Sequence, residues 1–349
     1  MLWHWFITVF WVDESPPFQP AFHPYSWLSL VSWICQAMPA YFVALGAKHE
    51  AARARNTPSD TQLSRMLRQL LGGLSPAMVL VGGWFAARLL LSRTTPEVVR
   101  WWWLRSLDEP VFGPLTWILL FVLLIPTRPV MLHLHDRFGL IMPVILAALA
   151  TAADATTYEH GPATGHINTL LVWLCVQQIG FFWGQLRGVS RQTRWAVFLG
   201  GFSALAALTL TDIYPIAMEG SIGWQTPNIS QPTITVIALA VGQLGAMLLI
   251  EPRYTARRQA GGQRRLSRWF RRNAFAWFLW HAAGYATYAV VVLHNFRGLA
   301  EPPWNDWRDA QWLWFRPVTL PLIALATLPY VLVYMLIRKL TNRRNTLLP

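Results

Sequence analysis

Residues 114–134 read PLTWILLFVLLIPTRPVMLHL, and this stretch decides the fold class. It holds one charged residue, Arg128. A helix of this length is about 30 Å long, which matches the thickness of the hydrocarbon core of a bilayer. A chain in lipid must satisfy its own backbone hydrogen bonds, so the stretch predicts a transmembrane helix.

Other apolar stretches of comparable length recur along the chain. They cover residues 27–46, 74–92, 138–154, 167–185, 195–211, 232–250, 273–294 and 316–337. None shows the alternating pattern and regular turns of a membrane β-barrel. The sequence therefore predicts an all-α fold, a polytopic membrane helical bundle that forms a single domain over residues 1–349.

The composition points to the same class. Of the 349 residues, 54% are hydrophobic and 13% are charged, a balance that is atypical of soluble domains. The net charge of +13 could mark nucleic-acid binding, yet the basic residues lie between the apolar stretches. We therefore expect cationic membrane loops and no nucleic-acid partner.

Cys35 and Cys175 lie inside apolar runs without metal-ligand spacing, so we expect no metal site.

Lysine and arginine collect in alternate loops, which predicts the topology. The rich segments are 47–72, 135–138, 186–194, 252–272 and the tail after 337. Basic loops lie on the cytoplasmic side, so we expect a basic cytoplasmic loop at 253–272. Strict alternation also makes the opening fragment a span, which gives about ten transmembrane helices with both termini cytoplasmic. With no cleavage signal recognised, we expect an uncleaved, multi-pass protein of the bacterial inner membrane.

The opening fragment, MLWHWFITVFWVDE at residues 1–14, is short for a span. Its apolar run of about twelve residues would rise only about 18 Å as a helix. Either the helix starts part-way through the membrane, or the true start of the protein lies upstream of Met1. We favour the second alternative, in which the first helix is incomplete here.

His4 lies in this fragment at a depth where an ionisable side chain is costly and is usually functional or faces the protein interior. The alternative is a histidine at the membrane surface, flanked by Trp3 and Trp5 in an aromatic belt. Depth argues against that alternative, because the outer belt should begin near Trp11.

Two further sets of residues are candidates for binding. Arg65 and Arg68 lie three apart in SDTQLSRMLRQLLGGLSP (59–76), so they share a helical face and could grip phosphate groups. The alternative is that these two arginines only reflect the excess of positive charge in cytoplasmic loops.

His281, in NAFAWFLWHAAG (273–284), is either a buried, hydrogen-bonded histidine or the wall of a pocket.

The chain contains no G-x-x-x-x-G-K, H-E-x-x-H or G-x-S-x-G motif. These are the commonest signatures of nucleotide-binding proteins, zinc proteases and serine hydrolases. His133 and His135 lie two apart on a helix end and point to different faces, so they make a poor metal pair.

Six ordered stretches resemble motifs of the acyltransferase-3 family of bacterial integral-membrane acyltransferases, of the type common in actinobacteria. They are SWICQAMPAYFVALGAKHEAA (32–52), RMLRQLLGGLSP (65–76), GPLTWILLFVLLIPTRPVMLHLHDRFG (113–139), INTLLVWLCVQQIGFFWGQLRG (167–188), YPIAMEGSIGWQTPNISQPT (214–233) and FLWH (278–281). Each motif is weak alone, but their order and spacing hold over nearly the whole chain.

The match is incomplete at four places. His4 and Trp5 match the end of the family's first motif, whose arginine would lie upstream of Met1. Gln177 stands where the group often has histidine, and Ala47 replaces the second glycine of a Gly-Gly turn. Asn228 follows Pro227, where the group has serine.

The resemblance implies transfer of an acyl group from a cytoplasmic acyl-CoA to a hydroxyl or amine of an envelope glycan or lipid. His4 would then be the general base, since a neutral imidazole can accept the proton of the attacking group. Arg65 and Arg68 would hold the phosphates of the donor, and His281, Tyr214 and Asn228 would line the tunnel or the acceptor end. No permanently bound cofactor is expected, and the other partner is membrane lipid.

The rival interpretation is a non-enzymatic protein: a transporter, a flippase-like protein or an inactive relative of such an enzyme. Transporters tend to show internal repeats with paired broken helices, and the sequence shows no convincing repeat.

Overall fold

A computed structural model describes most of the chain. The described residues are 8–10, 18–20, 26–53, 74, 77–86, 88–90, 93, 108–160, 163–210, 213–218, 232–259, 265–288 and 311–345. They divide into two compact units. Unit 1 draws on Met1–Pro24, Gln62–Ile125 and Arg264–Pro349, and unit 2 on Tyr25–Thr61 and Pro126–Gln263.

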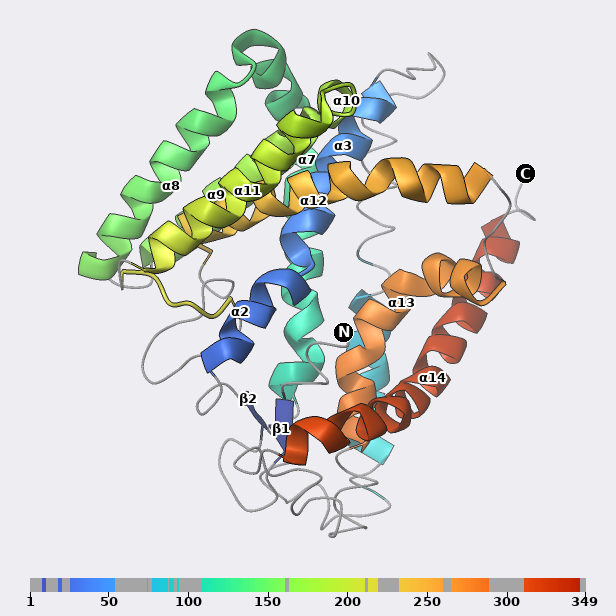
Figure 1. Ribbon diagram of the computed structural model, residues 1–349. Coiled ribbons are helices and arrows are strands. Elements are labelled where there is room, and N and C mark those ends of the chain that lie inside the picture. The colour runs from blue at the N-terminus through green and yellow to red at the C-terminus, as the bar shows by residue number, and fades with distance from the viewer. Residues whose placement is uncertain are drawn as a thin grey trace. The chain divides into compact units, whose positions relative to one another are not determined.

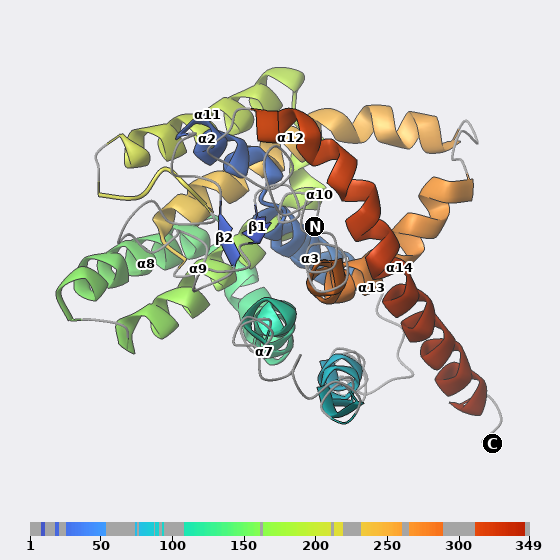
Figure 2. The ribbon, with the colours of Figure 1, turned by 90° about the horizontal axis from the view of Figure 1, so that it is seen from below.

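Unit 2 consists of packed helices (Figure 1). They are α2 (Ser26–Cys35), α3 (Met38–Arg53), the part of α7 (Asp108–Phe138) that follows Ile125, α8 (Ile141–His160), α9 (Ala163–Phe181), α10 (Trp183–Leu186), α11 (Arg191–Thr209) and α12 (Ile234–Gln259). The main contacts pair α11 with α12, α8 with α9 and α3 with α9. Figure 2 shows α8 and α9 lying side by side from a second direction.

The sequence predicts one uninterrupted span over 27–46, but the chain leaves the helix at Gln36 and Ala37, between α2 and α3. Proline explains the break. Pro39 has no N–H to donate, and its ring clashes with the carbonyl one turn earlier, so a helix cannot run smoothly through it.

Glycines let the helices of unit 2 approach closely. A Cβ atom added at Gly46 of α3 would collide with the carbonyl of Gln177, and one added at Gly180 of α9 would collide with the carbonyl of Val43. The two backbones therefore touch where α3 crosses α9. Contacts between small residues are typical of helix pairs in membranes, where the hydrophobic effect does not drive association.

Unit 1 is built from α13 (Arg265–Tyr288), α14 (Gln311–Asn345), the first part of α7 and the described helical residues between 77 and 90. Its core is rich in aromatic side chains, including Trp84, Trp277, Trp280, Tyr285, Tyr288 and Tyr334. The helix α14 contains Pro317, Pro321 and Pro329 and bends along its length (Figure 1). Prolines are tolerated inside membrane helices and are a common cause of such bends.

The described residues of the opening fragment differ from the expectation. We expect a helix there, but Thr8–Phe10 forms a strand, β1, which pairs antiparallel with β2, Phe18–Pro20. Threonine, valine and phenylalanine favour strands. An isolated helix of about a dozen residues is also marginally stable by itself.

Four segments of the described chain are long and apolar enough to cross a membrane: Leu30–Arg53, Val111–Phe138, Ile234–Arg253 and Pro317–Ile337. The helices also expose large apolar side chains, such as Val130 (58% exposed) and Leu325 (65%). Such exposure is unfavourable in water and suits contact with lipid. These findings support the predicted helical membrane protein at the level of its class.

Candidate functional site

Two of the six residues predicted to form the site lie within the described chain. Tyr214 is in unit 2 and His281 is in unit 1, and both are buried. His4, Arg65, Arg68 and Asn228 lie outside the described residues.

Tyr214 belongs to a buried polar network centred on Asp154. Its hydroxyl donates to Asp154 Oδ2 at 3.1 Å, and the main-chain N–H of Ile234, at the start of α12, donates to the same oxygen at 3.0 Å. Asn168 Nδ2 donates to Asp154 Oδ1 at 2.5 Å. Asp154 is 3% exposed. Its carboxylate is therefore removed from water, and hydrogen-bond donors from three other segments replace the water molecules.

Asn168 has an orientation that its partners determine. Its Nδ2 group donates to Asp154 and, at 3.0 Å, to the carbonyl of Pro232. Neither partner can donate, so the amide nitrogen must point toward them. The network therefore ties α8, α9 and the segment around Tyr214 to the first turn of α12.

A second buried group lies at the break between α2 and α3. Gln243 of α12 donates to the carbonyl of Gln36 at 2.6 Å and accepts from the N–H of Ala40 at 2.9 Å. The side chain of Gln36 accepts from the N–H of Met38 at 3.1 Å. Gln243 thus satisfies backbone groups that the interrupted helix leaves free.

The segment 213–218 is held against α2 by two further bonds. Ser32 Oγ accepts from the N–H of Met218 at 3.0 Å, and Trp33 Nε1 donates to the carbonyl of Ile216 at 2.7 Å. Together with the bond from Asn168 to the carbonyl of Pro232, these contacts connect three of the stretches quoted above, those that begin at 32, 167 and 214.

His49 is a buried histidine that the sequence analysis did not single out. It lies near the end of α3, is 5% exposed, and its Nδ1 accepts from Gln177 Nε2 at 3.0 Å. The carbonyl of His49 accepts from Arg128 Nη2 at 3.2 Å. The sequence does place His49 directly after an apolar stretch and Arg128 inside one, which is the signal that could have identified the pair.

His281 lies in α13 and is a buried, hydrogen-bonded histidine. It is 6% exposed, and its Nδ1 donates to the carbonyl of Phe278 at 2.5 Å, one turn earlier in α13. Its ring also stacks on Phe278.

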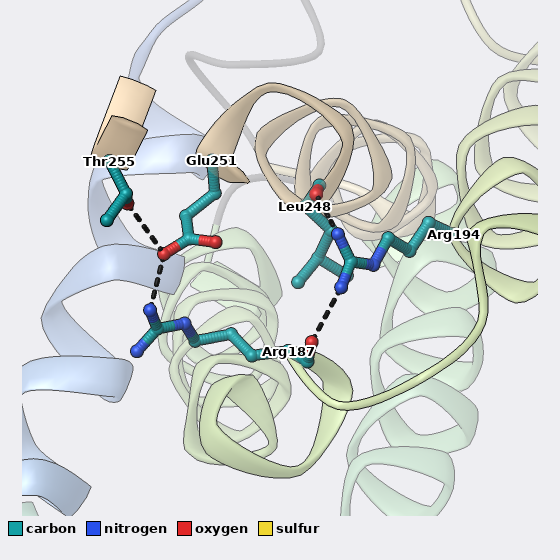
Figure 3. Close-up of polar contacts among 5 residues, drawn as sticks. All are labelled: Arg187, Arg194, Leu248, Glu251 and Thr255. Atoms are coloured by element: carbon teal, nitrogen blue, oxygen red, sulfur yellow. Dashed lines mark hydrogen bonds and ion pairs between the residues drawn. The ribbon is translucent and has the colours of Figure 1, made fainter. Parts of the chain in front are cut away.

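Arginines of the basic segment 186–194 take part in local structure. Arg187 pairs with Glu251 of α12 at 2.5 Å, and Thr255 donates to the same carboxylate at 3.1 Å. Figure 3 shows these contacts. Arg194 donates to the carbonyls of Leu248 and Arg187 at 3.1 and 2.6 Å. At least these two arginines therefore hold helix ends together, besides contributing positive charge.

No metal-binding group is found among the described residues, because no three His, Cys, Asp or Glu side chains come together there. Comparison of the chain with protein-family models, with curated proteins and with solved structures finds no match. The site in unit 2 therefore has to be interpreted from its own chemistry, which offers an imidazole, a carboxylate, a guanidinium and several carboxamides within a helical membrane unit.

Proposed function

We propose that the protein is a membrane-bound acyltransferase. It moves an acyl group, such as acetyl, from cytoplasmic acyl-CoA to a hydroxyl or amine of an envelope glycan, a lipid or another acceptor. The observation that supports this proposal is the convergence of three stretches that resemble acyltransferase-3 motifs. Their polar residues, including Ser32, Asn168 and Tyr214, are buried and joined by hydrogen bonds in unit 2.

In the proposed reaction, the acceptor hydroxyl attacks the thioester carbonyl while His4 takes its proton. The carbon–sulfur bond then breaks, the acyl group stays on the acceptor, and His4 returns the proton to the thiolate, so that coenzyme A leaves as a thiol. Arg65 and Arg68 hold the phosphates of the donor, and His281, Tyr214 and Asn228 line the tunnel or the acceptor end. A site enclosed by helices keeps water from hydrolysing the thioester.

The test is acetyl transfer from radiolabelled acetyl-CoA in membranes that contain the wild type or the variant His4→Ala. Loss of a general base lowers rates by about 100-fold to 10,000-fold, so label should fall to the background. The variant His133→Ala is the control, because His133 is exposed near the end of α7 and should leave transfer unchanged. Equal transfer by the wild type and His4→Ala would remove His4 from the mechanism.

We also propose the finer topology of about ten membrane-crossing helices with both termini in the cytoplasm. The alternation of basic loops supports it, whereas the strand at Thr8–Phe10 speaks against a helix in that part of the first span. Single cysteines introduced into the loops, labelled by a reagent that does not cross membranes, would test each loop. Labelling of loop 253–272 from outside intact cells would contradict the proposed topology.

A transporter or flippase-like protein is the second candidate. The broken pair α2 and α3 favours it, because interrupted helices are common at transport sites. However, Gln243 occupies the freed backbone groups at this break. Labelled acetyl that becomes covalently attached to membrane material identifies an acyltransferase, whereas uptake without covalent attachment identifies a transporter.

A further inference from the structure

The first turns of α11 lie beside the end of a candidate membrane span. The backbones of α11 and α12 approach closely at Gly201 and Gly242, and again at Phe198 and Gly245. These contacts advance in opposite directions along the two helices, so the helices are antiparallel. The apolar segment of α12 that is long enough to cross a membrane ends at Arg253. The helix α11 therefore begins at the level where that span ends, which in a bilayer is the polar surface.

Positive charge gathers at this level. The segments 183–199 and 248–255 contain four arginines and one acidic residue, Glu251. That carboxylate is paired with Arg187 at 2.5 Å. Arg194 donates to two main-chain carbonyls, which carry no charge, so these contacts do not neutralise its guanidinium group (Figure 3). The two segments therefore carry a surplus of positive charge at the end of α12.

Arg191 is the arginine that is best placed to bind an anion. It precedes Arg194 by three residues, so it lies about 4.5 Å further along α11 toward the polar surface. Its side chain is exposed and makes no hydrogen bond or ion pair with the part of the chain that the structure describes. A guanidinium group can bind two phosphate oxygens at once, because its N–H groups form a planar fork.

The face of α11 that begins at Arg191 changes its chemistry along the helix. Residues four apart are neighbours on a helix surface, and the next two are Trp195, which is 42% exposed, and Leu199, which is 55% exposed. The Trp195 ring is held by an edge contact with Phe198, with ring centroids 5.5 Å apart. Over about 12 Å the face passes from a cation to an aromatic ring and then to an aliphatic side chain.

A phospholipid has the same order of groups. Its phosphate is followed by the glycerol and ester groups and then by the acyl chains, and tryptophan side chains favour the level of the membrane–water interface. A soluble anion would use the positive charge but would leave Trp195 and Leu199 without a partner. The surplus of positive charge favours a headgroup with a net negative charge over a zwitterionic one.

We propose that this face of α11 binds an anionic phospholipid such as phosphatidylglycerol. Arg191 binds the phosphate, and the charges of Arg187 and Arg194 add attraction. The ring of Trp195 packs against the glycerol and ester groups, and Leu199 contacts an acyl chain. This inference is independent of the proposed function, because an acyltransferase and a transporter could both bind such a lipid.

The test is native mass spectrometry of the purified full chain in a neutral detergent, which gives the dissociation constant of the first bound lipid. Phosphatidylglycerol and phosphatidylcholine with identical acyl chains are compared, and the wild type should prefer phosphatidylglycerol. Arg191→Gln should weaken binding of phosphatidylglycerol about fivefold, which corresponds to about 1 kcal/mol, and binding of phosphatidylcholine less. Trp195→Ala should weaken binding of both lipids equally, because they share the glycerol and ester groups.

Two control variants separate a local site from general attraction. Arg191→Lys keeps the charge and should bind phosphatidylglycerol nearly as the wild type does. Arg137→Gln removes the same charge from an exposed position on α7 and should leave binding unchanged. Equal weakening by Arg137→Gln and Arg191→Gln would mean that binding follows the overall charge of the chain, and would overturn the inference.

Two measurements on the wild type need no variant, so they decide the question even if a variant unfolds in a thermal unfolding control. Equal affinity for phosphatidylglycerol and phosphatidylcholine would overturn the inference. Excess coenzyme A should not displace bound phosphatidylglycerol, because it offers phosphates without acyl chains. Displacement by coenzyme A would assign the arginines to a soluble anion and would also overturn the inference.

Discussion

The interiors of the two units differ in how they hold helices together. Unit 2 buries polar side chains that bond across helices, with Asp154, Gln177 and Gln243 among the central residues. The described core of unit 1 consists mainly of aromatic and aliphatic side chains, such as Trp280 stacked on Tyr330 at 5.5 Å. In unit 2 one residue can serve three partners, whereas in unit 1 the packing is spread over many contacts. Single substitutions should therefore be costlier in unit 2.

The largest effect is expected for Asp154→Ala in unit 2. The change removes the carboxylate that accepts from Asn168, Tyr214 and the N–H of Ile234, so three donors lose this acceptor at once. We expect a loss of about 3 kcal/mol in the free energy of unfolding, measured in detergent micelles. Asp136→Ala is the control, because its pair with Arg53 is about half exposed and should contribute less than about 1 kcal/mol. Equal losses for the two variants would contradict the importance of the network.

Gly180→Ala should have the next largest effect. The new Cβ would meet the backbone carbonyl of Val43 where α3 crosses α9, and a backbone cannot move aside as a side chain can. Overpacking of this kind costs about 2 kcal/mol. Gly184→Ala is the control, since nothing lies within 4 Å of its added Cβ. A stable Gly180→Ala protein in the same unfolding measurement would show that the two helices are not so close.

Tyr330→Phe tests the aromatic unit with a smaller expected effect. It removes the hydrogen bond between the hydroxyls of Thr287 and Tyr330, which are 2.5 Å apart, and keeps the ring that stacks on Trp280. We expect a loss of about 1 kcal/mol in thermal unfolding experiments. A cost as large as that of Asp154→Ala would remove the proposed difference between the units.

Glu251→Gln should have the smallest effect. The carboxylate pairs with Arg187, which is half exposed, and solvent screens such a pair. We expect a change below about 1 kcal/mol that shrinks further in high salt. A larger, salt-independent loss would show that this contact at the end of α12 supports the helix more strongly than a surface pair does.

The sequence predicted the helical class and most helix positions, because long apolar runs have few other solutions in lipid. It did not predict the break at Gln36 and Ala37, although Pro39 marks it, since the apolar pattern continues across the break. It also did not predict the strand at Thr8–Phe10. A strand depends on pairing with a second segment, which the hydrophobicity of the first does not reveal.

The candidate site was predicted less completely than the fold. The resemblance pointed to Tyr214 but not to its partner Asp154, and its stretches contain both Gln177 and His49 without indicating that the two form a pair. Such partners depend on which helices meet, and hydrophobic periodicity does not specify tertiary contacts between one helix and another. The buried histidine, carboxylate and carboxamides become a group only once α3, α8 and α9 are placed together in unit 2.

The most direct test of the account is the transfer of radiolabelled acetyl groups from acetyl-CoA to the glycan and lipid fraction of membranes that contain the wild-type chain. The account predicts covalent label well above that of membranes without the chain, with release of one coenzyme A thiol for each acetyl group transferred. Label equal to that of the membranes without the chain would contradict it.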